Sequence, residues 1–277
     1  MTTPPKAGLY FDVPDSTYHK WDLCSSTRLR LMEEKTPLHV NHAVNFPEAW
    51  DSPAKQLGRA VHCLVLEPKR WPTRFAQAPE CDRRTKEGKQ LWADFCTLNE
   101  GREIVKAETG QIAQEMAMSV EAHKDAAALL RKADVREVSL VTDLWSVPFK
   151  ARLDAYGEDI VVDLKTTRSA SPEEFERSIM NYGYGLQAAA YLRAADRCGL
   201  KVKHFCFICV ESEAPHAVAV YRLKNDVIDL FDARLAPLVE RYGQCVKSRK
   251  WPGYSDTVTE IGVPAWYQRK LENGEAA

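Results

Sequence analysis

Two aspartates and a lysine lie close together in a segment whose pattern predicts a β-hairpin. Asp154 and Asp163 are nine positions apart, and Lys165 follows the second aspartate by two positions. Runs of strand-forming residues flank residues 157–159, which favours a turn at that point. If the chain folds about the bond between Glu158 and Asp159, the two aspartates face each other, and Lys165 lies on the same strand face as Asp163.

This arrangement is suited to metal-dependent hydrolysis of phosphodiesters. Carboxylates that face each other across a hairpin repel one another, whereas a divalent cation between them reverses the sign of that interaction. The alternative is that both acids are solvated residues near a turn. The continuous apolar run at residues 160–162 favours the metal site, because it predicts a strand buried on both faces, where charged side chains need partners.

The length and composition indicate an α/β protein with enough chain for a large core. Of the 277 residues, 45% are hydrophobic and 28% are charged, and the formal net charge is −1. A nucleic acid would therefore bind in a local groove with metal ions rather than through overall charge. We expect one domain over residues 1–277, with a mostly helical part at 1–110 that carries His62, a catalytic sheet core at 111–250 and a tail at 251–277.

The eight cysteines and the N-terminus bear on location rather than on chemistry. Residues 1–6 lack the features of a secretion signal, and no apolar run approaches the roughly 20 residues of a membrane span. We therefore expect reduced thiols, no membrane partner and a cytoplasmic location in a bacterial or phage-infected cell. Cys206 and Cys209 have the spacing of a metal or redox motif, but residues three apart on a strand point to opposite faces, which argues against a zinc or iron–sulfur site.

Apolar periodicity and cap residues predict the order of helices and strands. The expected elements, in chain order, are an opening loop, helices at about 25–36, 54–66, 86–98 and 110–133, a strand at 136–142, the Asp154 and Asp163 strands, helices at about 171–183 and 186–195, strands at 203–210 and 216–223, a helix at 225–247 and a loop-like tail. This order predicts a mixed sheet covered by helices.

The polar segment at residues 69–110 is rich in cations, namely Arg70, Arg74, Arg83, Arg84, Lys86 and Lys89. We favour a solvated face as the interpretation of these side chains. The alternative is a rim that contacts DNA, or a mobile lid over the site.

Four short blocks occur in an order that resembles a known family. They are Gly58-Arg-Ala-Val-His62, Asp154 on the hairpin, Asp163-Leu164-Lys165, and Gln187-Ala-Ala-Ala-Tyr191. Together they resemble the PD-(D/E)XK nuclease superfamily, its RecB-like branch, and within it the RecE-type exonucleases (exodeoxyribonuclease VIII of lambdoid prophages). The resemblance covers most of residues 20–266. It implies a restriction-endonuclease-like α/β core, a mixed central sheet flanked by helices, with a helical N-terminal region.

The resemblance also implies a metal site and its ligands. Mg²⁺ is expected, with Mn²⁺ able to substitute, and one or two ions are possible in each site. The implied ligands are His62, Asp154, Asp163 and the main-chain carbonyl of Leu164. Without the resemblance, a histidine on an apolar helix is more often a packed core residue.

Further residues take supporting roles by the same resemblance. Lys165 would orient the attacking water or stabilise charge in the transition state. Gln187 would orient Lys165 or a DNA phosphate, and Tyr191 would contact the DNA strand; the alternative for both is ordinary helix packing near the sheet. Glu137 would hold a second ion through water, or pair with an arginine.

The implied function is degradation of one strand of duplex DNA from a 5′ end. It would leave 3′ overhangs for a single-strand annealing protein in phage-type recombination, and the enzyme would be a ring-shaped homotetramer around DNA. Two alternatives remain open: a RecB-like nuclease that acts on single strands or flaps, and a catalytically inactive protein that binds DNA ends.

Overall fold

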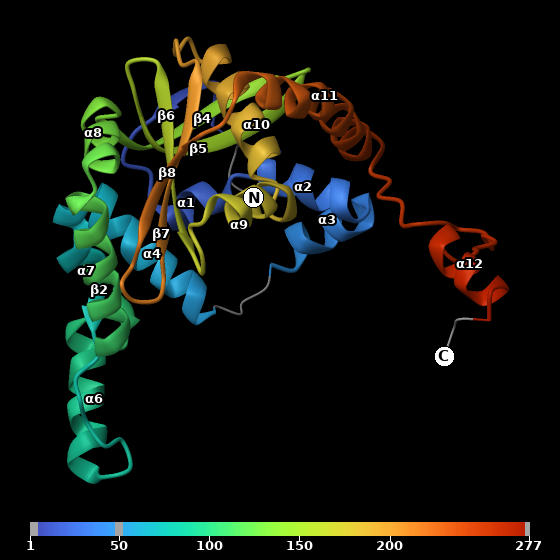
Figure 1. Ribbon diagram of the computed structural model, residues 1–277. Coiled ribbons are helices and arrows are strands. Elements are labelled where there is room, and N and C mark those ends of the chain that lie inside the picture. The colour runs from blue at the N-terminus through green and yellow to red at the C-terminus, as the bar shows by residue number, and fades with distance from the viewer. Residues whose placement is uncertain (1–4, 48–51, 275–277) are drawn as a thin grey trace.

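The fold is a six-stranded mixed sheet between two layers of helices (Figure 1). A computed structural model describes residues 5–47 and 52–274, so the first four N-terminal residues and the last three of the tail lie outside the described residues. The sheet order is β1-β4-β5-β6-β7-β8, with β6 and β7 parallel and the other pairs antiparallel. The strands are β1 (Gly8–Tyr10), β4 (Val135–Leu144), β5 (Val147–Gly157), β6 (Ile160–Thr167), β7 (His204–Glu211) and β8 (Val218–Arg222).

Each face of the sheet has its own hydrophobic core. On one face lie α2 (Ser26–Glu34), α3 (Pro37–Asn45), α9 (Pro172–Asn181), α10 (Tyr184–Arg197) and α11 (Asn225–Ser248). On the other lie α4 (Pro53–Leu66), α7 (Ala107–Ala122) and α8 (Lys124–Lys132). The predicted mixed sheet flanked by helices is therefore confirmed, and two cores on one sheet hold its strands in place.

Several smaller elements lie at the margins of this core. They are α1 (Asp15–Lys20), η1 (Pro68–Arg70), α5 (Trp71–Arg74), the two-stranded parallel sheet of β2 (Phe75–Gln77) and β3 (Glu103–Val105), α6 (Lys86–Leu98) and α12 (Ala265–Glu272). Figure 1 shows that α6 extends away from the sheet beyond α7, and that α12 stands apart from the body of the protein.

The helices at 54–66 and 86–98 match the prediction, whereas the expected single helix at 110–133 was wrong. It is two helices, α7 and α8, because His123 has an extended backbone and its Nδ1 accepts a hydrogen bond from the Ala126 amide at 3.2 Å. This side chain caps α8, which separates the helices. The prediction of an opening loop was also incomplete, because this segment contains β1 and α1. The tail that was predicted as a loop contains α12.

The two cysteines with motif spacing confirm the predicted strand geometry. Cys206 is buried in the core beneath α4 and α7, and Cys209 is buried in the core beneath α10. Their side chains therefore lie on opposite faces of β7. Among the residues that the structure describes, no helix combines the length and apolar character needed to cross a membrane.

Candidate active site

Strands β5 and β6 separate at Asp154 and Asp163, and we call this point the fork of the sheet. β5 pairs with β4 along nearly its whole length, and β6 pairs with β7 along all of its own, but β5 and β6 are paired in only three rows. The last row joins Ala155 to Val162, and its register confirms the predicted turn centre between Glu158 and Asp159. Asp154 and Asp163 are the next residues along, so they lie where the two strands part.

Asp154 occupies the gap that the fork opens. The amide of Leu164 has no partner on β5 at this point, and it donates to Asp154 Oδ2 at 2.8 Å. On the neighbouring strand β4, Glu137 interrupts the pairing opposite Asp154 and has a positive φ of 47°. For a residue other than glycine this conformation costs about 1–2 kcal/mol, and such strain is concentrated at functional sites.

His62 reaches the same gap from α4. Its Nε2 lies 2.8 Å from the Leu164 carbonyl oxygen, and its Nδ1 lies 3.6 Å from Asp154 Oδ2. The helix approaches β6 closely one turn earlier, where a Cβ on Gly58 would lie 3.4 Å from Thr166 Oγ1. The close approach of α4 to β6 therefore brings the imidazole to the fork.

His62, Glu137 and Asp154 form a cluster that fits a divalent cation. One ligand atom from each lies within 4.8 Å of the others. Burial, and then the nearby Asp154 charge, raises the pKa of Glu137 to about 8, which is the penalty for gathering carboxylates without a cation. Neighbouring ligands of an octahedral ion lie about 3 Å apart when each bond is near 2.1 Å. His62 Nε2 lies 2.8 Å from the Leu164 carbonyl oxygen, so these two atoms are spaced as neighbouring ligands would be.

Asp163, Lys165 and Gln187 form a closed set beside that cluster, on the α10 face of β6. Asp163 is 2% exposed, and its Oδ2 lies 2.6 Å from Lys165 Nζ. Gln187 donates to Asp163 Oδ1 at 2.8 Å and accepts from Lys165 at 3.1 Å. The Lys165 ammonium also lies 4.4 Å from the centre of the Tyr184 ring. The structure thus places Asp163 next to the His62–Glu137–Asp154 cluster rather than within it.

Burial and pairing act in opposite directions on the two charges of this set. Burial raises the pKa of Asp163 to about 6, and the Lys165 ammonium opposes that rise. Burial also disfavours the charged form of Lys165, but Asp163 and Asp154 outweigh it, so the pKa of Lys165 is raised. Lys165 is therefore a permanent cation here, which suits charge stabilisation rather than proton abstraction. Asp163 Oδ2, although buried, accepts no well-directed hydrogen bond, so it keeps a lone pair for a further cation.

Comparison with known proteins identifies the family. A family described as a PDDEXK-like domain of unknown function (DUF3799) matches residues 25–261. The chain belongs to this family. The PDDEXK-like assignment agrees with the resemblance to the PD-(D/E)XK superfamily that the sequence blocks carry.

One solved structure shares the overall fold of this chain. A protein of Eubacterium rectale with an inferred exonuclease assignment has a TM-score of 0.63 at 12% identity, and the match covers 94% of this chain and 98% of that one. A phage-related exonuclease from Haemophilus somnus 129PT has a TM-score of 0.38 at 10% identity, over 81% and 83% of the two chains. A search of curated proteins found no match.

The candidate site opens into a cleft of about 850 Å³. His62, Glu137 and Asp154 line it together with Tyr191, which lies on α10 one turn after Gln187. Burial raises the pKa of Tyr191 to about 12, and Ser26 of α2 lines the same cleft. Tyr191 is therefore part of the cleft wall.

The strand that carries Asp154 also brings two cations into the cleft wall, and the sequence analysis missed them. Lys150 Nζ donates to the carbonyls of Tyr18 and Trp21 at 2.8 and 2.7 Å, and Arg152 lies 4.3 Å from the Tyr18 ring centre. Alternation on β5 puts residues 150 and 152 on one face, which was the available signal. What could not be anticipated is that an N-terminal segment covers them.

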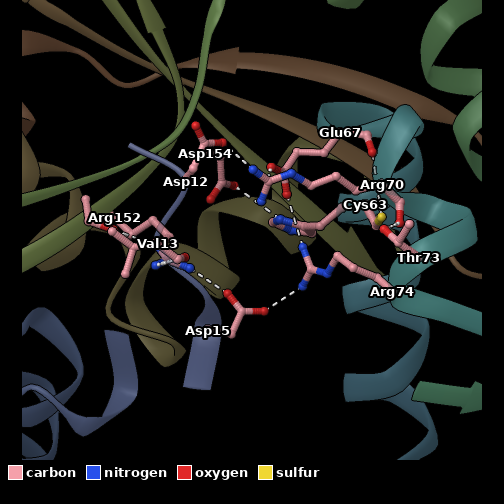
Figure 2. A network of polar contacts seen from close by, with 12 residues as sticks. Asp12, Val13, Asp15, Cys63, Glu67, Arg70, Thr73, Arg74, Arg152 and Asp154 are labelled. Atoms are coloured by element: carbon pink, nitrogen blue, oxygen red, sulfur yellow. Dashed lines mark hydrogen bonds and ion pairs between the residues drawn. The ribbon is translucent and has the colours of Figure 1, made fainter. Parts of the chain in front are cut away.

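The basic segment divides between two kinds of environment. Arg70 and Arg74 belong to a polar network near the site, with Asp12, Asp15 and Glu67 as partners (Figure 2). In the loop that precedes α6, Arg84 pairs with Asp82 and its side chain is 90% exposed, and Arg83 lies over the ring of Trp92 on α6. Arg84, next to α6, is therefore a solvated cation. Arg70 and Arg74, near the site, have a structural role instead.

Proposed function

We propose that this protein is a metal-dependent exonuclease that hydrolyses phosphodiesters in double-stranded DNA. The observation that carries the proposal is the forked sheet, which gathers His62, Glu137, Asp154 and the Leu164 carbonyl beside a buried ammonium group. The PDDEXK-like family and fold support it.

The donor set favours Mg²⁺ as the natural ion, with Mn²⁺ able to replace it. Carboxylate and carbonyl oxygens suit Mg²⁺, and an imidazole ligand is better tolerated by Mn²⁺. We propose His62, Asp154 and the Leu164 carbonyl as ligands, with Asp163 joining them through Oδ2 when the ion is bound. Glu137 would take a second ion, directly or through water. A bound divalent ion supplies a low-pKa water and neutralises charge on the phosphate.

Lys165 and Gln187 would act on the reacting groups from the other side of β6. Lys165, held by Asp163 and Gln187, presents a fixed positive charge that stabilises the phosphate as negative charge develops, or orients the attacking water. Gln187 keeps the ammonium and the Asp163 carboxylate in one geometry, since it hydrogen-bonds to both. Tyr191 would contact the DNA strand from the cleft wall.

The finer proposal is that one strand is degraded from its 5′ end, which leaves 3′ overhangs for a single-strand annealing partner, as in the RecE-type exonucleases that the sequence resembles. The test compares linear duplex labelled at either the 5′ or the 3′ end with linear single strands and flaps, in Mg²⁺, Mn²⁺ and EDTA. Early release of the 5′ label from duplex, abolished by EDTA, is the expected result. Preference for single strands or flaps would support a RecB-like nuclease instead, and binding of ends without hydrolysis would support an inactive end-binding protein.

A homo-oligomer is also proposed, and two projecting segments support it. The C-terminal segment exposes large apolar side chains, with Ile261 at 90%, Trp266 at 58% and Leu271 at 49%. Leu98, at the end of the α6 arm, is 81% exposed. Exposed apolar surface of this kind marks contacts with other molecules, and a ring of four copies around DNA would cover it. Light scattering of the full-length protein would give the number of copies.

A further inference from the structure

A wall of side chains lies beside the metal cluster in the cleft. A second cavity of about 470 Å³ lies behind that wall, and the two cavities share four lining residues. These shared residues are Asp15, Arg74, Glu137 and Arg152. Glu137 belongs to the metal cluster, so the cluster and the wall are in direct contact.

The centre of the wall is Asp15, which joins two arginines from different parts of the protein. Its Oδ1 lies 2.5 Å from Arg152 Nη1 on β5, and its Oδ2 lies 2.5 Å from Arg74 Nη2 on α5. Figure 2 shows Asp15 between these two guanidinium groups. Arg152 is only 11% exposed and also donates to the Val13 carbonyl at 2.9 Å, so the sheet side of this bridge is firmly anchored.

A second tie, outside the cleft, holds the same two segments together. Arg70 pairs with Asp12 on the N-terminal side and with Glu67 at 3.1 Å on the α4 side. Arg74 also pairs with Glu67 at 3.1 Å. Arg70 lines the second cavity and not the cleft, whereas Arg74 lines both. The two arginines therefore share a carboxylate partner and a helical neighbourhood but differ in whether they face the site.

The position of the wall restricts how a nucleic-acid strand can lie across the metal cluster. A strand cut in its interior must continue on both sides of the scissile phosphate. Among the residues that the structure describes, the Arg74–Asp15–Arg152 bridge lies across the side beyond Glu137, where its side chains occupy the space that a continuing strand would need. A strand end, by contrast, can reach the cluster from the open cleft.

We propose that the Asp15–Arg74 bridge is an end stop that limits this nuclease to strand termini. The inference rests on the proposed nuclease function and deepens it, because it assigns the preference for ends to named residues. Opening the bridge joins the two cavities, so a continuous strand can pass through the site.

The experiment compares Arg74→Ala with Arg70→Ala, a matched control that removes the same side chain from the outer tie alone. The substrates are a linear duplex and the same duplex closed into a circle, with Mn²⁺. For the wild type and Arg70→Ala we expect hydrolysis of the linear form only. For Arg74→Ala we expect the rate on circles, relative to the rate on linear DNA, to rise at least about tenfold, with longer first products.

A second measurement does not depend on hydrolysis. In EDTA, fluorescence anisotropy compares binding of an open-ended duplex with that of a dumbbell whose two ends are closed by hairpin loops. The wild type should bind the open-ended duplex more tightly than the dumbbell. The ratio of the two affinities should fall in Arg74→Ala and stay the same in Arg70→Ala. If Arg74→Ala fails to fold, as judged by circular dichroism, Asp15→Asn tests the same bridge with a side chain of nearly equal size.

The outcomes separate this inference from the proposed function. Equal circle-to-linear ratios in the wild type and a folded, active Arg74→Ala variant, with an unchanged preference for open ends, would overturn the end stop alone. Rapid cutting of circles by the wild type would also overturn it. If the wild type hydrolyses no linear DNA at all, the nuclease function is rejected together with the end stop that depends on it.

Discussion

Strand β6 separates two groups of charges that are balanced in different ways. On the α10 face, Asp163 and Lys165 form an ion pair, Gln187 hydrogen-bonds to both, and the two opposite charges sum to zero. In the fork of the sheet, Glu137 and Asp154 gather two carboxylates around His62, and burial raises the pKa of Glu137. The first group pairs opposite charges, whereas the second gathers acids that a bound divalent cation would stabilise.

This difference assigns the two groups different roles. A buried ion pair with hydrogen bonds to a third side chain holds a fixed geometry, and its charges are not available to an exchangeable ligand without cost. A cluster of acids with a raised carboxyl pKa, on a strained backbone at Glu137, gains most when a cation binds. We therefore expect the fork to bind the metal, and the Asp163–Lys165–Gln187 group to position an ammonium next to it.

The largest expected effect comes from Asp154→Asn, which removes a charge from the fork. We expect hydrolysis of linear duplex to fall about 1000-fold or more, at the upper end of what losing one preorganised electrostatic group costs. Calorimetry should show that Mn²⁺ no longer binds. In the wild type, Mn²⁺ at about a hundredfold excess over its Kd should add about 2.7 kcal/mol of stability, and the variant should lose this gain.

The same variant tests whether the fork lacks a cation. An asparagine can still accept from the Leu164 amide, and the change removes a charge that opposes ionisation of Glu137. The metal-free variant should therefore be at least as stable as the metal-free wild type in urea unfolding. A clear loss of stability would mean that the carboxylate is structural and that the two charge groups do not differ as described.

The next largest effect is expected for Lys165→Met, which breaks the ion pair between Asp163 and Lys165. Activity should fall about 100-fold or more, since the positive charge next to the phosphate is lost, while Mn²⁺ binding should persist. Asp163 would be left buried without its partner, which costs about 3–5 kcal/mol of stability. Denaturant unfolding measures this loss.

A double variant, Asp163→Asn with Lys165→Met, provides the control for that prediction. Removing both charges should restore most of the stability that Lys165→Met loses, because replacing a whole buried pair is far less costly than breaking it. Gln187 can still donate to the asparagine oxygen at position 163. A double variant as unstable as the single one would show that the pair is not the unit that the geometry indicates.

The contrast between the two groups also shows which parts of the site the sequence could predict. Asp154, Asp163 and Lys165 are close in the chain, so hairpin register alone was enough to bring them together. His62 and Gln187 are on helices far away in sequence, and only the resemblance to a family placed them here. Glu137 was foreseen as a neighbour, but its positive φ and its place in the cluster depend on how two strands distort together.

The fold was predictable for similar reasons. Elements with strong local signals, such as the capped helix at residues 86–98, matched closely. The break at His123 was missed because histidine is an uncommon cap, and α12 was missed because a short exposed helix carries little apolar periodicity. The N-terminal segment that covers Lys150 and Arg152 depends on tertiary contacts, which no local pattern encodes.

A smaller effect is expected for Gln187→Ala, which removes the hydrogen bonds to Asp163 and Lys165 without changing the charge of the site. Lys165 and Asp163 keep their ion pair but lose a shared hydrogen-bonding partner. Loss of such an orienting contact typically costs about 10–100-fold in activity. The fall should appear in kcat rather than in KM, and Gln187→Glu should not rescue it, because a carboxylate cannot donate to Asp163. An unchanged kcat would reduce Gln187 to a packing residue.

The smallest expected effect concerns Lys150, a buried cation balanced by dipoles rather than by a carboxylate. Two carbonyls accept from its ammonium, and burial, with the nearby Arg28 charge, lowers its pKa to about 8. The unfolded chain has the ordinary lysine pKa near 10.4, so between about pH 8 and pH 10.4 it binds more protons than the folded chain. The stability contributed by this group therefore rises with pH across that window, by at most about 1.4 kcal/mol per pH unit.

Lys150→Met removes this dependence, so the difference in unfolding free energy between wild type and variant should shift in favour of the wild type as pH rises from about 8 to about 10.4. Urea unfolding at several pH values measures the difference, in which the titrations of other lysines, tyrosines and cysteines cancel. The exposed Lys55 on the same cleft, changed to methionine, serves as the matched control. If the difference in unfolding free energy between wild type and Lys150→Met does not change with pH, the Lys150 ammonium is no more costly to bury than a solvated one. The carbonyl dipoles would then balance this cation as fully as Asp163 balances Lys165.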